Sequence, residues 1–147
     1  MMTFSRRDLA ALLPAVALRA SAQQAAPAAP PALLPGKVYH SAEIPYTGND
    51  DKKGRRFFLG TTHTGFNLET HETILGAGMD THPPHQHVHE EILIIVSGTL
   101  DVHVEGKTET AESGSMVYFA SNVLHNAHNS GTVPCRYYVI ELRGAEA

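Results

Sequence analysis

Apolar and polar residues alternate with a period of two in much of the chain after Lys37, and turn residues interrupt this alternation. Leu100, Val102 and Val104 alternate with polar residues, which is typical of a strand with one buried face. Residues 92–96 form a continuous apolar run rich in β-branched side chains. Further strands are predicted over residues 69–75, 108–111, 116–119 and 135–142, and no convincing helical stripe follows residue 22. Many short strands at this spacing predict an all-β domain, either a sandwich or a barrel.

The N-terminal segment has a different pattern. Arg6 and Arg7 precede an apolar stretch over residues 9–18, and small residues at 20 and 22 suit a signal-peptidase site. The arginine pair resembles a twin-arginine export signal, while a buried amphipathic helix is the alternative. The apolar stretch is roughly half as long as a bilayer-spanning helix, so we expect no membrane anchor after cleavage.

Three segments are therefore predicted: a signal peptide of the twin-arginine type (1–22), a linker rich in Ala and Pro (23–36) and a β domain (37–147). Prolines at the density of the linker favour an extended chain. With an export signal, we expect a bacterial protein that is periplasmic or secreted.

Composition narrows the possible functions. The 147 residues include 11 basic and 15 acidic side chains, and a net charge of −4 argues against nucleic-acid binding. A single cysteine excludes an intrachain disulfide and a cysteine zinc cluster. Ten histidines, four of them within residues 82–89, point instead to a soluble protein with a metal site.

Two segments carry the candidate metal ligands. In the first, His85 and His87 are two residues apart and would share one face of a strand, while Glu91 can offer a carboxylate to the same centre. The second segment contains His125. Three imidazoles and one carboxylate suit Mn, Fe, Ni, Co, Cu or Zn. The alternative is a solvated, histidine-rich loop that holds no specific metal.

The other polar residues support weaker interpretations. His82 and His89 are interpreted as solvated loop residues rather than as groups near the metal or at the entrance of the site. Residues 48–54 are predicted to be a polar loop, and Tyr137 is expected to serve packing. The cations in and after this loop are interpreted as a solvated charge run, with steering of an anionic substrate as the alternative: Lys52, Lys53, Arg55 and Arg56.

The first histidine segment resembles the first motif of the cupins, a family of small β-barrel proteins with two metal-binding motifs. His85, His87, Glu91 and Gly98 match this motif at the family's spacing. Gly78, the glycine before the first histidine, is displaced by one residue. The match implies that this segment supplies part of the ligands of a metal site.

The second segment resembles the second cupin motif through Gly114, His125 and Asn129. Ala120 and Asn122 stand where the family usually has proline and glycine. Asparagine tolerates the left-handed backbone conformation better than most residues, so Asn122 can still serve the turn.

The resemblance implies a cupin-type β-barrel, also called a double-stranded β-helix or jelly roll, over about residues 37–147. It implies that His85, His87, Glu91 and His125 bind one divalent transition metal, with no catalytic residue identified beyond them. Manganese or iron is favoured, because twin-arginine export would let the protein load its metal in the cytoplasm, where copper and zinc are scarce. We also expect a homodimer, with residues 37–44 crossing to the partner.

Two functions remain open from the sequence. The favoured one is an exported metal-dependent enzyme that acts on a small organic substrate, most simply by a dioxygenase-like oxidation, with isomerase, lyase and decarboxylase chemistry also possible. The alternative is a non-catalytic cupin that binds a small molecule or metal for sensing or sequestration. The fold by itself does not choose between them.

Overall fold

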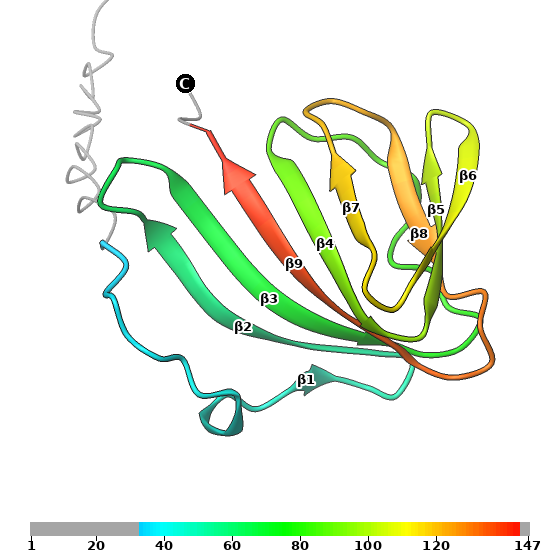
Figure 1. Ribbon diagram of the computed structural model, residues 1–147, viewed down its shortest axis with the longest axis horizontal. Coiled ribbons are helices and arrows are strands. Elements are labelled where there is room, and N and C mark those ends of the chain that lie inside the picture. Colours follow the sequence, from blue (N-terminus) through cyan, green and yellow to red (C-terminus); the bar gives the residue numbers. More distant parts are fainter. Residues whose placement is uncertain (1–32, 145–147) are drawn as a thin grey trace, which may run out of the picture.

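The computed structural model describes residues 33–144, which form an almost entirely β structure (Figure 1). The predicted signal peptide and most of the predicted linker lie outside the described residues. Among residues 33–144, no helix is long and apolar enough to cross a membrane.

Nine strands and one short 3-10 helix make up the described fold. In chain order they are η1 (Ser41–Glu43), β1 (Thr47–Gly48), β2 (Lys52–Thr61), β3 (Asn67–Leu75), β4 (Glu90–Ser97), β5 (Thr99–Val104), β6 (Lys107–Glu112), β7 (Met116–Phe119), β8 (His125–His128) and β9 (Cys135–Arg143). A six-stranded sheet has the order β1-β2-β3-β9-β4-β7, and a three-stranded sheet has the order β6-β5-β8. All strand pairs within the two sheets are antiparallel, and the prediction of an all-β domain is confirmed.

The hydrophobic core lies between the two sheets. Figure 1 shows the small sheet beside the β4 and β7 end of the large sheet, where the chain curls into a barrel. Inward-facing residues alternate along the strands, as the period of two predicts: β9 alternates buried and half-buried positions from Cys135 to Glu141. Leu93 and Ile95 of β4 pack into the same core as Leu100 of β5. Cys135 is fully buried, as expected of a small apolar side chain.

The structure corrects the interpretation of residues 48–54 as a polar loop, because Lys52 begins strand β2, and it corrects the interpretation of Arg55 as a solvated charge. Arg55 is only 11% exposed, and its guanidinium donates to Glu72, whose side chain is completely buried on β3. Arg136 on β9 donates to the same carboxylate. Glu72 therefore supplies the counter-charge for Arg55 and Arg136, which are paired within the sheet.

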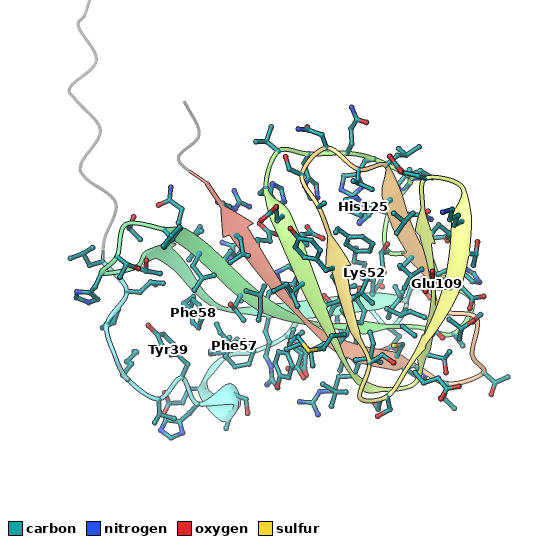
Figure 2. All side chains as sticks on the ribbon, turned by 45° about the horizontal axis from the view of Figure 1, so that its top comes forward. Tyr39, Lys52, Phe57, Phe58, Glu109 and His125 are labelled. Atoms are coloured by element: carbon teal, nitrogen blue, oxygen red, sulfur yellow. The ribbon has the colours of Figure 1, made fainter. Side chains whose placement is uncertain are left out.

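The segment before β1 packs against strand β2 of the same chain. The Ser41 carbonyl accepts a hydrogen bond from Arg55 Nη1 at 2.7 Å, and the ring of Tyr39 lies 5.0 Å from that of Phe58 (Figure 2). The Leu34 amide also donates to the Thr61 carbonyl at 2.8 Å. A crossing of residues 37–44 to a partner chain stays a prediction.

Two residues of the second motif shape the turns around the site. Asn122 has a φ of +60°, so it does adopt the left-handed conformation that the sequence predicts for it. Asn129 is fully buried, and its amide Nδ2 lies 2.9–3.0 Å from the carbonyl oxygens of Leu75, Gly76 and Val133. The side chain of Asn129 therefore ties two loops together.

Candidate metal centre

The first histidine segment is a loop, not a strand. Residues 76–89 connect β3 to β4 and contain no strand, so the prediction that His85 and His87 lie on a strand is wrong, although their imidazoles do meet at one centre. Pro83 and Pro84 explain this, since proline has no amide donor for a sheet. His85 instead joins His125 in an isolated antiparallel bridge, with backbone N···O distances of 3.1 and 2.9 Å. This bridge brings the two histidine segments together.

Backbone carbonyls orient two of the imidazoles. His125 Nδ1 donates to the Val123 carbonyl, and His87 Nδ1 donates to the His89 carbonyl, each at 2.8 Å. A neutral imidazole that donates through Nδ1 has a free lone pair on Nε2. Both Nε2 atoms, together with His85 Nδ1, are buried without a hydrogen-bond partner among the described residues.

The three histidines can offer nitrogen atoms that all lie within 4.8 Å of one another. Burial lowers the pKa of His125, which favours the neutral ring with its lone pair available at neutral pH. The ring of Phe119 stacks on that of His125 at 4.1 Å and closes one side of the cluster. Leaving buried lone pairs without a donor is costly, and a bound cation would satisfy them together. The donor set therefore fits a metal ion.

Glu91, near the start of β4, supplies the carboxylate. Its Oε1 lies 3.3 Å from His87 Nε2, and its Oε2 lies 3.9 Å from His125 Nε2. The carboxylate is shared with His89, whose Nε2 lies 3.4 Å from Oε1. His87, His89 and Glu91 thus form a second group of possible ligands that overlaps the first at His87.

His82 and His89 are not solvated loop residues, which corrects that interpretation. The His89 ring stacks on that of His87 at 3.5 Å, and the His82 ring lies 3.9 Å from that of His85. Both residues are half-buried. For His89 the available signal was its place in the histidine-rich run of residues 82–89, since strand parity does not apply to this loop.

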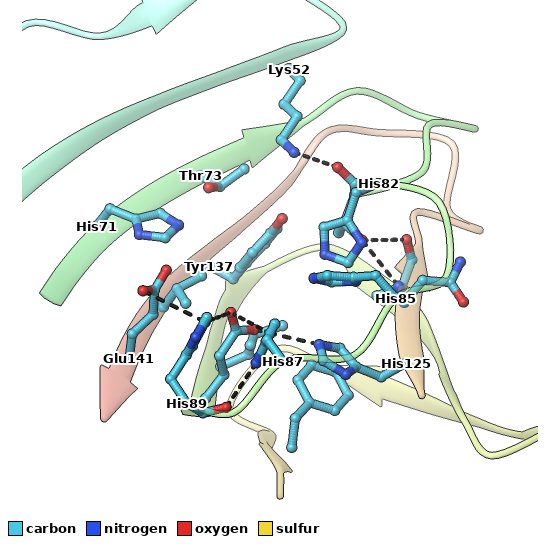
Figure 3. Close-up of a pocket in the computed structure, with 17 residues that line it drawn as sticks. Lys52, His71, Thr73, His82, His85, His87, His89, His125, Tyr137 and Glu141 are labelled. Atoms are coloured by element: carbon cyan, nitrogen blue, oxygen red, sulfur yellow. Dashed lines mark hydrogen bonds and ion pairs between the residues drawn. The ribbon is translucent and has the colours of Figure 1, made fainter. Parts of the chain in front are cut away.

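The histidine cluster lines a cavity of about 450 Å³ between the sheets (Figure 3). Its apolar wall includes Leu93, Phe119 and Val139. Sequence reasoning missed the polar groups that β2, β3 and β9 add to the lining: Lys52, His71, Thr73, Tyr137 and Glu141. Tyr137 is buried, as expected of a packing residue, but it also borders the cavity. No local spacing signals these residues, since only strand pairing brings them to the histidines.

Comparison with known proteins agrees with this fold. Residues 71–141 match the family model described as the cupin domain. The structure is similar to KdgF from a Halomonas species (TM-score 0.63, 17% identity, covering 76% of this chain and 98% of that one). It is also similar to an RmlC-like cupin from Shewanella frigidimarina (TM-score 0.60, 18% identity, 73% and 90% covered) and to a predicted oxalate decarboxylase from Thermotoga maritima (TM-score 0.60, 18% identity, 73% and 99% covered). No curated protein matches the sequence.

The matched segment covers just under half of the chain and these solved structures share its fold, so the predicted cupin-type β-barrel is confirmed. The structural neighbours share the fold at low identity, so their own activities do not transfer to this chain. The histidine and glutamate groups of the cavity could hold a metal ion.

Proposed function

We propose that His85, His87, Glu91 and His125 bind one divalent transition metal. The observation that supports this most directly is the set of three buried imidazole nitrogens without partners, which face one another beside a carboxylate. Imidazole and carboxylate are ligands of manganese, iron, nickel, cobalt, copper or zinc. The carbonyls of Val123 and His89 hold the imidazoles of His125 and His87 with their lone pairs directed inward.

We further propose that the protein is a metal-dependent enzyme acting on a small organic substrate, with dioxygenase-like oxidation favoured. A bound metal would supply Lewis-acid chemistry to a substrate in the cavity. The chain itself supplies an apolar wall that excludes water and a polar wall that can orient the substrate. The alternative is a cupin that only binds a small molecule or metal, and the same donor set would serve it.

Metal analysis of the purified protein tests the metal site. Replacing His125 with Ala removes a ligand at the centre of the cluster, so most of the bound metal should be lost while the far-ultraviolet circular dichroism spectrum stays that of a β protein. His63→Ala is the matched control, because His63 is exposed in the loop between β2 and β3. Full metal occupancy at wild-type affinity in His125→Ala would contradict the assignment.

Substrate screening separates the two functions. The metal-loaded protein is incubated with small organic compounds in air and without oxygen, and products are measured by mass spectrometry. Products that form only in air support the favoured oxidation, whereas products in both conditions support isomerase, lyase or decarboxylase chemistry. Binding of a compound without turnover in either condition supports the non-catalytic alternative.

Export by a twin-arginine route is proposed from Arg6 and Arg7 and accounts for manganese or iron as the native metal. Equilibrium affinity favours copper and zinc, so the metal would have to be loaded in the cytoplasm and retained through slow exchange. Replacing both arginines with lysine should stop export, and sending the mature chain through an unfolded-export route should introduce copper or zinc. Unchanged export would contradict the route, and identical metal content from both routes would contradict the reason for it.

A further inference from the structure

Lys52 is an unusual member of the cavity wall. It is the first residue of β2, and its ammonium group donates to the backbone carbonyl of Thr81. Among residues 33–144, no carboxylate lies within ion-pair distance of this ammonium group, and no other lysine or arginine lines the cavity. Lys53, the next residue, differs: its ammonium pairs with Asp50 at 3.5 Å outside the cavity.

The environment of Lys52 favours a bound anion. The side chain as a whole is exposed at the edge of the cavity, yet burial lowers the pKa of its ammonium group. The Thr81 carbonyl accepts a hydrogen bond but neutralises no charge. A cation that is partly removed from water is stabilised by an opposite charge, which the described chain does not supply.

Two hydroxyl groups lie on the same side of the cavity. Thr73 of β3 and Tyr137 of β9 are opposite each other in the register of the large sheet. Figure 3 shows the Tyr137 hydroxyl between Lys52 at one end of the cavity and His87 and His125 at the other, and Thr73 makes a side-chain hydrogen bond to Tyr137. An ammonium and a tyrosine hydroxyl are both donors that suit the oxygens of a carboxylate. The cavity therefore carries a cation at one end and the histidine donors at the other.

We infer that the ligand of this cavity is a small organic acid, with one carboxylate at Lys52 and a second oxygen-bearing group directed to the histidine cluster. The inference rests on the proposed function, because the second group needs a metal among the histidines. The volume of about 450 Å³ limits the size of the acid. A small acid fits a cavity of this size, which lies within the range of ordinary ligand pockets.

Calorimetry with dicarboxylates of increasing length tests the inference. Malonate, succinate and glutarate are titrated into the manganese-loaded protein, each beside its monoamide, in which one carboxylate is replaced by a neutral group of similar shape. Wild-type protein should bind at least one diacid about tenfold more tightly than its monoamide, as a charged hydrogen bond provides. Lys52→Met should lose this preference, and Lys53→Met should keep it.

The outcomes separate this inference from the metal proposal. Manganese binding is measured first for every variant, and circular dichroism confirms that each is folded. If manganese binds but Lys52→Met retains the wild-type preference, or no diacid binds, the inference is wrong and the metal site stands. If manganese does not bind to the wild-type protein, the metal proposal fails. The same titrations on metal-free protein then test whether Lys52 binds a carboxylate. A lower diacid affinity in Lys52→Met than in the wild-type protein supports this role, and equal affinity of the two proteins overturns it.

Discussion

Burial changes the protonation of two histidines of the cavity, His82 and His125. Burial is the main reason that the pKa values of His82 and His125 lie below the ordinary value of 6.5, although carbonyl hydrogen bonds partly oppose the effect. Below pH 6.5 the unfolded chain therefore binds more protons at these residues than the folded chain does. The resulting stability is present above pH 6.5 and is lost as the pH falls through the folded-state pKa values.

The metal-free protein should accordingly become less stable as the pH is lowered from 7 to 5. The urea concentration at the midpoint of unfolding, measured at each pH, should therefore fall. His125→Gln removes one of the two groups responsible, so its midpoint should fall less steeply with pH. His63→Gln, in an exposed loop, should keep the wild-type slope. Equal slopes for wild type and His125→Gln would show that His125 does not contribute.

Two glycines in turns between strands differ in how closely other residues pack against them. Gly98, between β4 and β5, has a φ of +83°, and an added Cβ would lie 2.8 Å from Cys135 Cα. Gly106, between β5 and β6, has a φ of +80°, and an added Cβ would meet nothing within 4 Å. The two turns share the same backbone requirement, but only Gly98 is also packed against another strand.

Substitution by alanine separates these effects. Gly106→Ala should cost about 1 kcal/mol, because an L-residue is strained in the left-handed region. Gly98→Ala should cost about 3 kcal/mol, since the same strain is joined by overpacking against β9. Urea unfolding at constant m-value measures both. Equal losses would mean that β9 moves away without cost and that packing plays no part at Gly98.

At the scale of the whole molecule, the described residues leave β1 and β7 as the edges of one sheet and β6 as an edge of the other, while the outer edge of β8 is bridged to residues 80–85. Unpaired strand edges favour association with a second chain. The segment before β1 carries Val38, which is 71% exposed. An exposed apolar side chain on a segment that runs outside the barrel is compatible with the proposed crossing of residues 37–44 in a homodimer.

Light scattering at micromolar concentration should give twice the mass of the chain. Val38→Asp places a charge in the proposed interface and should shift the protein toward monomer. Val133→Asp is the matched control, because Val133 is also exposed but lies in the loop before β9. A monomeric mass for the wild-type protein would contradict the dimer, and equal masses for both variants would contradict the place of the interface.

The sequence by itself determined the strands whose core positions alternate, as in β5 and β9, because a period of two follows from the geometry of a strand. It also pointed to the candidate ligands His85, His87, Glu91 and His125, because each of the two segments that carry them resembles a cupin motif, although only the fold brings the two segments together. Only the tertiary structure decided the rest. Strand β2 pairs with β3 and its Arg55 meets Glu72 there, and the ammonium of Lys52 reaches the Thr81 carbonyl in a distant loop. Contacts between residues far apart in the chain arise only when the sheets close, so no local pattern contains them.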